Sequence, residues 1–377
     1  MSRVLGIVLC CVFATSAAAS SYSEFNAGIA AAKRKDYAGA TAHMSIALAA
    51  DDLNPAFRAP AYVVRGEASV IANQPANAIG DLSKAIEADP NYFDAYALRA
   101  LCYVATKQFD LAAADAAMLI RAKPYSVGSY AERAAVYLAQ KNFDAALGDL
   151  NTIVALAPRA ASSYLARGEA YRDHGDYAKA LEDIEKADDL SSSANVDYQR
   201  ALTYEAMSDY ARARSDYEKA AKLEPANPAV KVHLALLSWK SGDFAAAAKG
   251  FQAVRDAANK DLSSYAALWA ALSLAATGQT DLSQSITANL DRTKWPGPLL
   301  DLYSGTSTVA AVMAAAQGGE ADSRADHICE AAFYIGMWQV LHGDAAAGKV
   351  QLQNAAAQCS PQNIERDAAA VAYRRLP

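Results

Sequence analysis

The sequence has few of the residues and motifs that catalysis or nucleic-acid binding requires. Its 377 residues include five histidines, and no two of them stand at the i, i+4 spacing at which one helix presents both to a metal. A glycine-rich phosphate loop, a nucleophile elbow and an HExxH motif are all missing. The net charge is −6, and the longest basic run is 33–35. These absences predict a protein that is not an enzyme, needs no metal or other cofactor and does not bind nucleic acid.

Apart from its first residues, the chain also lacks a long apolar run. No later stretch reaches the ~20 apolar residues of a membrane-spanning helix, which predicts no integral membrane segment once the N-terminus is removed. Residues 1–19 have the features of an export signal, because Arg3 precedes the apolar stretch 4–13 and alanines 17–19 form a cleavage site. A buried N-terminal helix is the alternative. Cleavage after Ala19 would release a soluble protein, exported to the periplasm or secreted.

What the chain does have is an internal repeat. Pro90, Pro124, Pro158 and Pro225 are 34, 34 and 67 residues apart, and Ser192 takes the place of a proline between the last two. In phase with them, position 4 of the repeat is aromatic, position 8 is small and position 20 is alanine. These residues are Tyr62, Tyr96, Tyr130 and Tyr164, then Gly66, Ala100, Ala134 and Gly168, then Ala78, Ala112, Ala146 and Ala180. Small residues let two helices of a hairpin approach closely. Turn signals at 175–177 and 242–244 mark where one helix ends and the next begins along the chain. The pattern resembles the tetratricopeptide repeat (TPR), a helix–turn–helix unit of about 34 residues, over nearly the whole chain after residue 19.

A second pattern, of opposite charges, runs in phase with the first. In five repeats an arginine is followed sixteen residues later by an aspartate: Arg65–Asp81, Arg99–Asp115, Arg133–Asp149, Arg167–Asp183 and Arg200–Asp216. Where Leu234 takes the arginine position, Gly250 takes the aspartate position, so both partners disappear together. We therefore predict a salt bridge between the two helices of each hairpin, called here an Arg–Asp clasp. The alternative, that the arginines bind an anionic ligand, is disfavoured by five aspartates in register.

These patterns predict an all-α protein, a right-handed solenoid of helical hairpins with a capping helix at the C-terminus. The array would cover residues 20–294 in about eight hairpins, the eighth at 262–294, and would be most regular over 59–225. Residues 295–326 would be a connecting segment outside the repeat. Residues 327–377 would form a last hairpin and the cap, whose outer face would be polar through Glu365, Arg366, Asp367, Arg374 and Arg375.

Cysteine is scarce, and only Cys102, Cys329 and Cys359 follow the predicted signal. Cys329 would open the first helix of the last hairpin, and Cys359 would lie near the end of its second helix. Antiparallel helices bring such ends together, and an oxidising compartment permits the bond. We therefore predict a Cys329–Cys359 disulfide and a buried, unpaired Cys102.

The TPR resemblance implies a concave face formed by the first helices of the hairpins, near positions 5, 9 and 12. These positions are Val63, Glu67, Val70, Ala97, Leu101, Val104, Ala131, Ala135, Leu138, Leu165, Glu169, Arg172, Tyr198, Leu202, Glu205, Val232, Leu236 and Trp239. The part from 63 to 138 is apolar and the remainder is mixed, which is typical of a surface that binds other proteins or peptides. A superhelix that closes on itself, or a homodimer that buries this face, is the alternative. Val63 and Glu67 replace the lysine and asparagine with which some TPR proteins clamp a carboxylate.

Two segments near the C-terminus carry a narrower resemblance. WPGPLLDLYSG (295–305) and CEAAFYIGMWQVLHGD (329–344) are similar to the C-terminal part of NlpI-like TPR proteins of Gram-negative envelopes. In that family the fold is a periplasm-facing scaffold that brings a processing protease together with its substrate. The resemblance implies an adaptor role, although this chain has no lipid-attachment cysteine.

We therefore predict a non-catalytic protein–protein interaction scaffold of the bacterial cell envelope, which binds partner segments on its concave face. Two other classes of function remain open. An assembly subunit of a secretion or surface-polysaccharide machine would need a large obligate interface. A hydrolase would need a cleft of convergent carboxylates between repeats.

Overall fold

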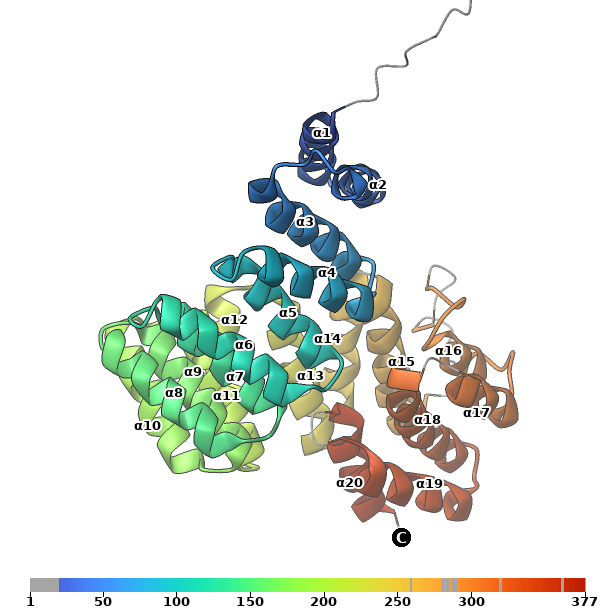
Figure 1. Cartoon of the computed structure of the whole chain (residues 1–377). Helices are drawn as coiled ribbons and strands as arrows, with labels where there is room; N and C mark the ends of the chain where they lie inside the picture. The colour runs from blue at the N-terminus through green and yellow to red at the C-terminus, as the bar shows by residue number, and fades with distance from the viewer. Residues whose placement is uncertain are drawn as a thin grey trace, which may run out of the picture. The chain divides into compact units, whose positions relative to one another are not determined.

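The computed structural model describes residues 20–257, 260–279, 282, 285–286, 290–318, 321–360 and 363–376. The predicted export signal lies outside the described residues. Within them, every regular element is a helix, which confirms the predicted all-α fold. The helices form two compact units, one up to Asp183 and one from Ile184 onward, so the division falls inside the predicted repeat array. Figure 1 shows the helices in chain order from blue to red.

The first unit is a row of helical hairpins. Its elements are α1 (Ser21–Lys33), α2 (Tyr37–Ala49), the short 3-10 helix η1 (Pro55–Phe57), α3 (Arg58–Ile71), α4 (Pro75–Ala88), α5 (Phe93–Ala105), α6 (Phe109–Ala122), α7 (Val127–Ala139), α8 (Phe143–Leu156), α9 (Ala161–His174) and α10 (Tyr177–Leu190), whose last residues belong to the second unit. From α1 to α9, each helix packs against the next one along the chain. The first helices α1, α3, α5 and α7 also contact one another in order, so they form one continuous face.

A tight turn with one left-handed residue joins the two helices of each hairpin. In the first unit these residues are Lys35, Asn73, Lys107, Lys141 and Gly175, with φ of 62°, 54°, 59°, 60° and 90°. A polar residue follows in several turns and caps the second helix: the side chain of Asp36 accepts from the Gly39 amide, and that of Asn142 from the Ala145 amide. The turn therefore ends one helix and starts the next within a few residues, which keeps the repeat length constant.

The second unit begins with two similar hairpins and then departs from the repeat. Its helices are α11 (Ala194–Ala206), α12 (Tyr210–Leu223), α13 (Pro228–Ser241), α14 (Phe244–Ala257), α15 (Lys260–Ala276), α16 (Gly297–Tyr303), α17 (Val309–Gly318), α18 (Ala321–Leu341), α19 (Ala345–Gln358) and α20 (Ile364–Arg375). The short helices α16 and α17 lie beside α18 (Figure 1). No helix among the described residues is both long and apolar enough to cross a membrane.

Of the predicted eighth hairpin, the structure describes one helix, α15. α15 ends at a turn in which Gly278 has φ of 87°, and the described residues between 277 and 296 contain no helix. Near their end, both the amide and the hydroxyl of Thr293 donate to the Asp291 carboxylate, a local turn that competes with helix formation. α18 also begins at Ala321 rather than at 327, so the last hairpin starts earlier than the pattern of small residues indicated.

The two units have different cores. In the first unit the core consists of small clusters, for example Ala78, Leu82 and Ala85 against Val63, with no fully buried tryptophan or phenylalanine among the described residues. In the second unit one large cluster extends from α13 to α20 and contains the buried rings of Trp239, Trp269, Phe251, Phe333 and Tyr334. Alanine-rich hairpins thus give way to an aromatic core in the C-terminal part of the chain.

Candidate partner-binding groove

All five Arg–Asp clasps are present in the structure. The pairs Arg65–Asp81, Arg99–Asp115, Arg133–Asp149 and Arg167–Asp183 are bidentate, with Nε and Nη2 each donating to one carboxylate oxygen at 2.7 to 2.9 Å. The hydrogen bond to the aspartate raises the pKa of each of these arginines, although burial opposes the charge. Two parallel hydrogen bonds of this kind fix both the distance and the angle between the helices that carry them.

The clasp arginines also connect neighbouring hairpins, which their sequence spacing did not reveal. Nη1 of Arg65 donates to Ser45 at 3.1 Å, and Nη1 of Arg99 donates to Ser83 at 2.9 Å, both on the second helix of the preceding hairpin. Nη1 of Arg167 reaches Asn151 in the same way, at 2.8 Å. Arg200 contacts three carboxylates, those of Asp188, Asp197 and Asp216. These guanidinium groups are occupied by the fold itself, so the anion-binding alternative has no support.

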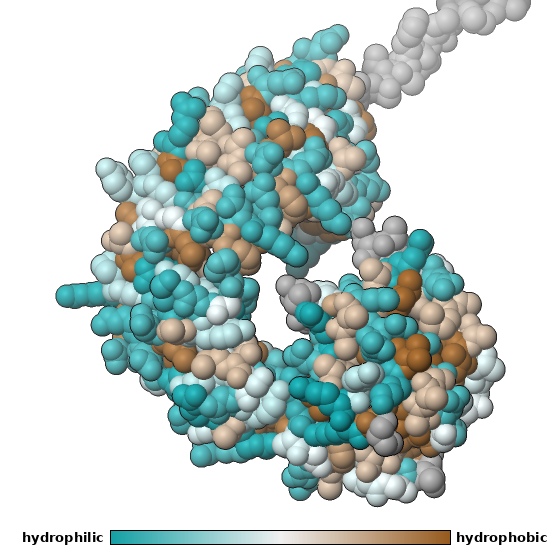
Figure 2. Space-filling model, turned by 90° about the horizontal axis from the view of Figure 1, so that it is seen from below, coloured by the Kyte–Doolittle hydropathy of each residue, from teal (hydrophilic) through white to brown (hydrophobic). Residues whose placement is uncertain are grey.

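A cavity lies on the first-helix face between α5 and α7. It has a volume of about 260 Å³, and its lining residues are Ala97, Ala100, Leu101, Val104, Glu132, Ala135 and Val136. The side chain of Leu101 remains 62% exposed at its edge. On the face that Figure 2 shows, hydrophobic and hydrophilic residues are intermixed. We call the cavity lined by the seven residues from Ala97 to Val136 the apolar pocket.

A second, polar cavity adjoins the apolar pocket. It has a volume of about 150 Å³ and shares Ala97 and Glu132 with its neighbour. Its charged lining residues are Asp94, Lys123 and Glu132. Burial raises the pKa of the Glu132 carboxyl, and the charge of Lys123 opposes that shift. We call this cavity the polar pocket, and the two pockets together the α5–α7 groove.

The groove brings together part of the predicted concave face. Ala97, Leu101, Val104 and Ala135 line the apolar pocket. Glu132, Ala100 and Val136 were not expected, because the family pattern was applied only to positions 5, 9 and 12. A helical wheel of α7 would have pointed to Glu132, since it precedes Val136 and Ala135 by about one helical turn.

Outside the groove, the predicted residues divide by burial. Glu67 and Ala131 are exposed, and eight others are partly buried: Val70, Leu138, Glu169, Arg172, Tyr198, Leu202, Glu205 and Val232. Leu138 packs against the cluster of Ala134 and Leu150, so a change there would also disturb the fold. Tyr198 lies beside the rings of Tyr217 and His233, and burial raises the pKa of Glu169.

Four predicted groove residues are buried and do not line an accessible surface. The exposed fractions are 7% for Val63 and Leu165, and 1% for Leu236 and Trp239. Val63 packs against the cluster around Leu82. Trp239 contacts Trp269 and Phe333 edge-on, with ring centroids 5.4 and 6.5 Å away. The sequence pattern placed these residues on the correct helices but could not show which neighbours cover them.

The C-terminal helix α20, which was expected to present a polar outer face, also covers Trp239. Nη1 and Nη2 of Arg375 donate to the carbonyls of Trp239 and Lys240 at 3.3 and 2.7 Å, at the end of α13. Glu365 is only 4% exposed and accepts from the Tyr334 hydroxyl at 3.1 Å. The prediction that Glu365 belongs to the polar outer face of the cap is therefore wrong, whereas Asp367, Arg374 and Arg375 are exposed.

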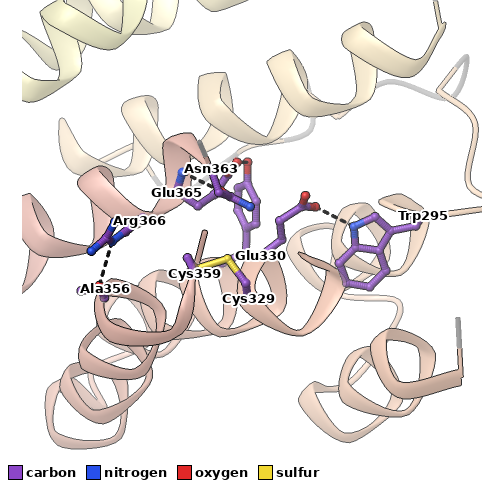
Figure 3. Close-up of a disulfide and its surroundings, with 9 residues drawn as sticks. Trp295, Cys329, Glu330, Ala356, Cys359, Asn363, Glu365 and Arg366 are labelled. Carbon is purple, nitrogen blue, oxygen red and sulfur yellow. Dashed lines mark hydrogen bonds between the residues drawn. A yellow bond between two sulfur atoms is a disulfide. The ribbon is translucent and has the colours of Figure 1, made fainter. Parts of the chain in front are cut away.

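The structure contains the Cys329–Cys359 disulfide, with Cα atoms 5.2 Å apart, and a buried free Cys102. Figure 3 shows the disulfide between α18 and α19, with Glu330 turned toward Trp295. The Glu330 carboxylate accepts from the Trp295 indole and from the Tyr265 hydroxyl, both at 2.7 Å. Burial raises the pKa of Glu330, and burial together with Glu330 raises the pKa of Glu365 to about 7. The half-buried Glu330 carboxylate thus fastens the segment 295–305 to the last hairpin.

Comparison with protein families identifies the repeats. Three segments, 65–127, 132–195 and 205–272, match models that are each described as tetratricopeptide repeat, and together they cover more than half of the chain. The chain belongs to the tetratricopeptide repeat family. TPR proteins generally mediate protein–protein interactions, and the TPR fold is generally a non-catalytic scaffold. No curated protein matches the sequence.

A solved structure of a TPR protein shares the fold, and other solved structures are more distantly similar. A tetratricopeptide repeat protein from Parabacteroides merdae ATCC 43184 is 16% identical, with a TM-score of 0.55 over 67% of this chain and 99% of its own. The thermophilic TPR protein TTC0263 from Thermus thermophilus is 20% identical, with a TM-score of 0.38 over 48% of this chain and 98% of its own. MamA from Desulfovibrio magneticus RS-1 is 20% identical, with a TM-score of 0.39 over 45% of this chain and 97% of its own. The NlpI-like resemblance of the C-terminal segments stays a prediction.

Proposed function

We propose that this TPR protein is a non-catalytic adaptor of the bacterial cell envelope, which binds a segment of a partner protein in the α5–α7 groove of its concave face. The observation that carries the proposal is the apolar pocket, because it lies on the first-helix face and leaves Leu101 62% exposed. An exposed apolar side chain at the edge of a cavity gains free energy when a partner side chain fills that cavity.

Two further features support an envelope location. The first nineteen residues have the order of charge, apolar stretch and small residues that export signals share. The Cys329–Cys359 disulfide suits an oxidising compartment. The NlpI-like resemblance agrees with both and suggests the same adaptor class.

The groove can be tested by site-specific photo-cross-linking in cells. A photo-reactive phenylalanine analogue replaces Leu101, and in a matched control it replaces Leu111, an exposed leucine on the second helix of the same hairpin. We expect cross-linked partners from position 101 that are absent from position 111. In a protein without the photo-reactive residue, Leu101→Glu should reduce the amount of these partners that co-purifies with the chain. Leu111→Glu should leave that amount unchanged. Identical cross-links from both positions would contradict the site assignment.

The location has a separate test. A fusion of residues 1–40 to a reporter that is active only in the periplasm should be active, and replacing residues 4–13 by polar residues should abolish that activity. Activity that persists without the apolar stretch would contradict the export signal.

A further inference from the structure

The α5–α7 groove combines an apolar pocket with two carboxylates that no described side chain pairs with. Glu132 belongs to the wall of both pockets, and Asp94 lines the polar one. Among the described residues, neither carboxylate forms a hydrogen bond or a salt bridge with a side chain. Both carboxylates are exposed, so a cation brought by a ligand can reach them and form charge-assisted hydrogen bonds with them.

Apart from the clasp arginines and Arg58, the charged residues of the surrounding first helices are acidic. Besides the clasp arginines, which are neutralised by their aspartates, helices α3, α5 and α7 carry Arg58, Glu67, Asp94 and Glu132. Arg58 is turned to the carbonyl of Leu48 and does not line the groove. The cation that lines the polar pocket is Lys123, which follows the end of α6. Two carboxylates therefore face one lysine, and the groove as a whole favours a positively charged ligand.

We propose that the groove accepts a basic amphipathic segment of a partner protein, in which an apolar side chain enters the apolar pocket and an adjacent lysine or arginine pairs with Glu132 and Asp94. This inference rests on the proposed function and adds the chemistry of the partner. The two contacts have different effects. The apolar side chain raises the affinity through the area that it buries, and the cation fixes the register of the segment and discriminates against acidic segments. The sign of the charge is opposite to that of a carboxylate clamp, which needs cations on the TPR protein.

Matched peptides provide the test on the purified chain. The probe is a fluorescein-labelled peptide of four Lys-Leu-Ala repeats. One twin has glutamate in place of each lysine, and another has alanine in place of each leucine. We expect fluorescence anisotropy to show binding of the Lys-Leu-Ala peptide and at least ~10-fold weaker binding of both twins, since a tenfold change corresponds to about 1.4 kcal/mol.

Variants of the protein test whether the peptide binds in the α5–α7 groove. Leu101→Glu should abolish binding of the Lys-Leu-Ala peptide, and Leu111→Glu should leave it unchanged. Glu132→Gln should weaken it ~5- to 10-fold and reduce its dependence on salt, because one ion pair is removed. Glu87→Gln removes the same charge from an exposed position on α4 and serves as the control. Lys123→Gln should leave the affinity equal or higher.

The outcomes separate this inference from the proposed function. Equal binding of the lysine and glutamate peptides, or unchanged affinity in Glu132→Gln, would overturn the inference. If no peptide binds while cross-links from position 101 persist, the partner has a different chemistry and the inference fails, but the groove stands. A concentration-dependent dimer that Leu101→Glu dissociates would make a second copy of the chain the occupant and would also overturn it.

Discussion

The two units of this protein use different means to hold helices together. In the first unit, small alanine-rich clusters are supplemented by a bidentate Arg–Asp clasp in the four hairpins from α3–α4 to α9–α10. The second unit keeps one clasp, Arg200–Asp216, but one aromatic cluster joins its helices α13 to α20, and a disulfide and a half-buried carboxylate fasten the last of them. A clasp acts within one hairpin and on its neighbour, so it can be repeated without change. An aromatic core depends on several helices at once, so it cannot be divided into repeats.

The comparison of the two units also bears on the position of the proposed binding site. Because clasps and small residues satisfy the hairpins of the first unit internally, the exposed faces of α5 and α7 are left free to form the α5–α7 groove. In the second unit the corresponding residues Leu236 and Trp239 are buried, and α20 covers the end of α13. The regular unit therefore leaves this surface open, whereas the irregular unit buries the equivalent surface in its own core.

The disulfide gives the largest expected effect and is confined to the second unit. Its two cysteines are 30 residues apart. Changing both Cys329 and Cys359 to serine should lower the free energy of unfolding by about 3.5 kcal/mol, because the unfolded chain is no longer constrained by a loop of that length. Hydrogen exchange should locate the loss in α18 to α20. A Cys102→Ala variant is the control. If the double serine variant lost as much protection in α5 and α7 as in α18 to α20, the effect of the disulfide would not be confined to the second unit.

An unpaired clasp should destabilise the first unit slightly less. Asp149 is 4% exposed, and Asp149→Ala would leave the Arg133 guanidinium without its carboxylate, at a cost of about 3 kcal/mol. Replacing both residues, as Arg133→Met with Asp149→Leu, should cost less than the single change, because no charge is left unpaired. Urea denaturation of the three proteins measures the difference. A double variant as unstable as Asp149→Ala would mean that the clasp contributes more than charge compensation.

The pH dependence of the second unit should come from its buried carboxyls. Burial raises the pKa of Glu365 from 4.5 to about 7, so the folded state binds more protons than the unfolded state between these values. Stability should therefore fall as pH rises from about 4.5 to 7, by at most about 1.4 kcal/mol per pH unit for one group. Glu330, whose pKa is also raised, acts in the same direction. Glu205 stays ionised in this window, because the hydrogen bond from His233 and the charge of Lys240 outweigh its burial and lower its pKa to about 2.

Glu365→Gln isolates this effect. The glutamine can still accept from the Tyr334 hydroxyl, so the variant should be more stable than the wild type at pH 8 and less dependent on pH. Thermal unfolding at pH 5 and pH 8 measures both quantities, with the exposed Glu218→Gln as the control. A variant whose pH profile follows that of the wild type would exclude Glu365 as the source.

The turns of the first unit should give the smallest effect. Lys141 has φ of 60° in the turn between α7 and α8, a conformation that costs an ordinary residue about 1 kcal/mol. Lys141→Gly should remove this strain at some cost in chain entropy, for a net gain below ~1 kcal/mol in urea denaturation. The same change at Lys123, outside such a turn, should bring no gain.

The sequence predicted the features that repeat. The Arg–Asp spacing indicated every clasp, since opposite charges sixteen residues apart lie opposite each other in a hairpin of this length. The spacing did not reveal that Arg65, Arg99 and Arg167 also reach the preceding hairpin, because their serine and asparagine partners vary in type and distance along the chain. The disulfide was predicted because both cysteines fell at adjacent ends of one hairpin.

The candidate groove was predicted only in part. Leu101, Val104 and Ala97 were expected from the family pattern, but Glu132 was not, although it links both pockets. Val63 and Trp239 were expected on the same face and are buried instead. Position within a repeat specifies the helix and the side of a residue, but accessibility depends on neighbours that the pattern does not describe.

By itself, the sequence determined the all-α class, the hairpin repeat and the clasps, because each of these depends on residues at a fixed, short separation along the chain. The tertiary structure alone decided which part of the first-helix face stays open. α20 docks on α13 through Arg375 and the carbonyls of residues 239 and 240, at a separation of about 135 residues. Contacts over such a distance depend on how α14 to α19 pack between them, and no local pattern specifies that packing.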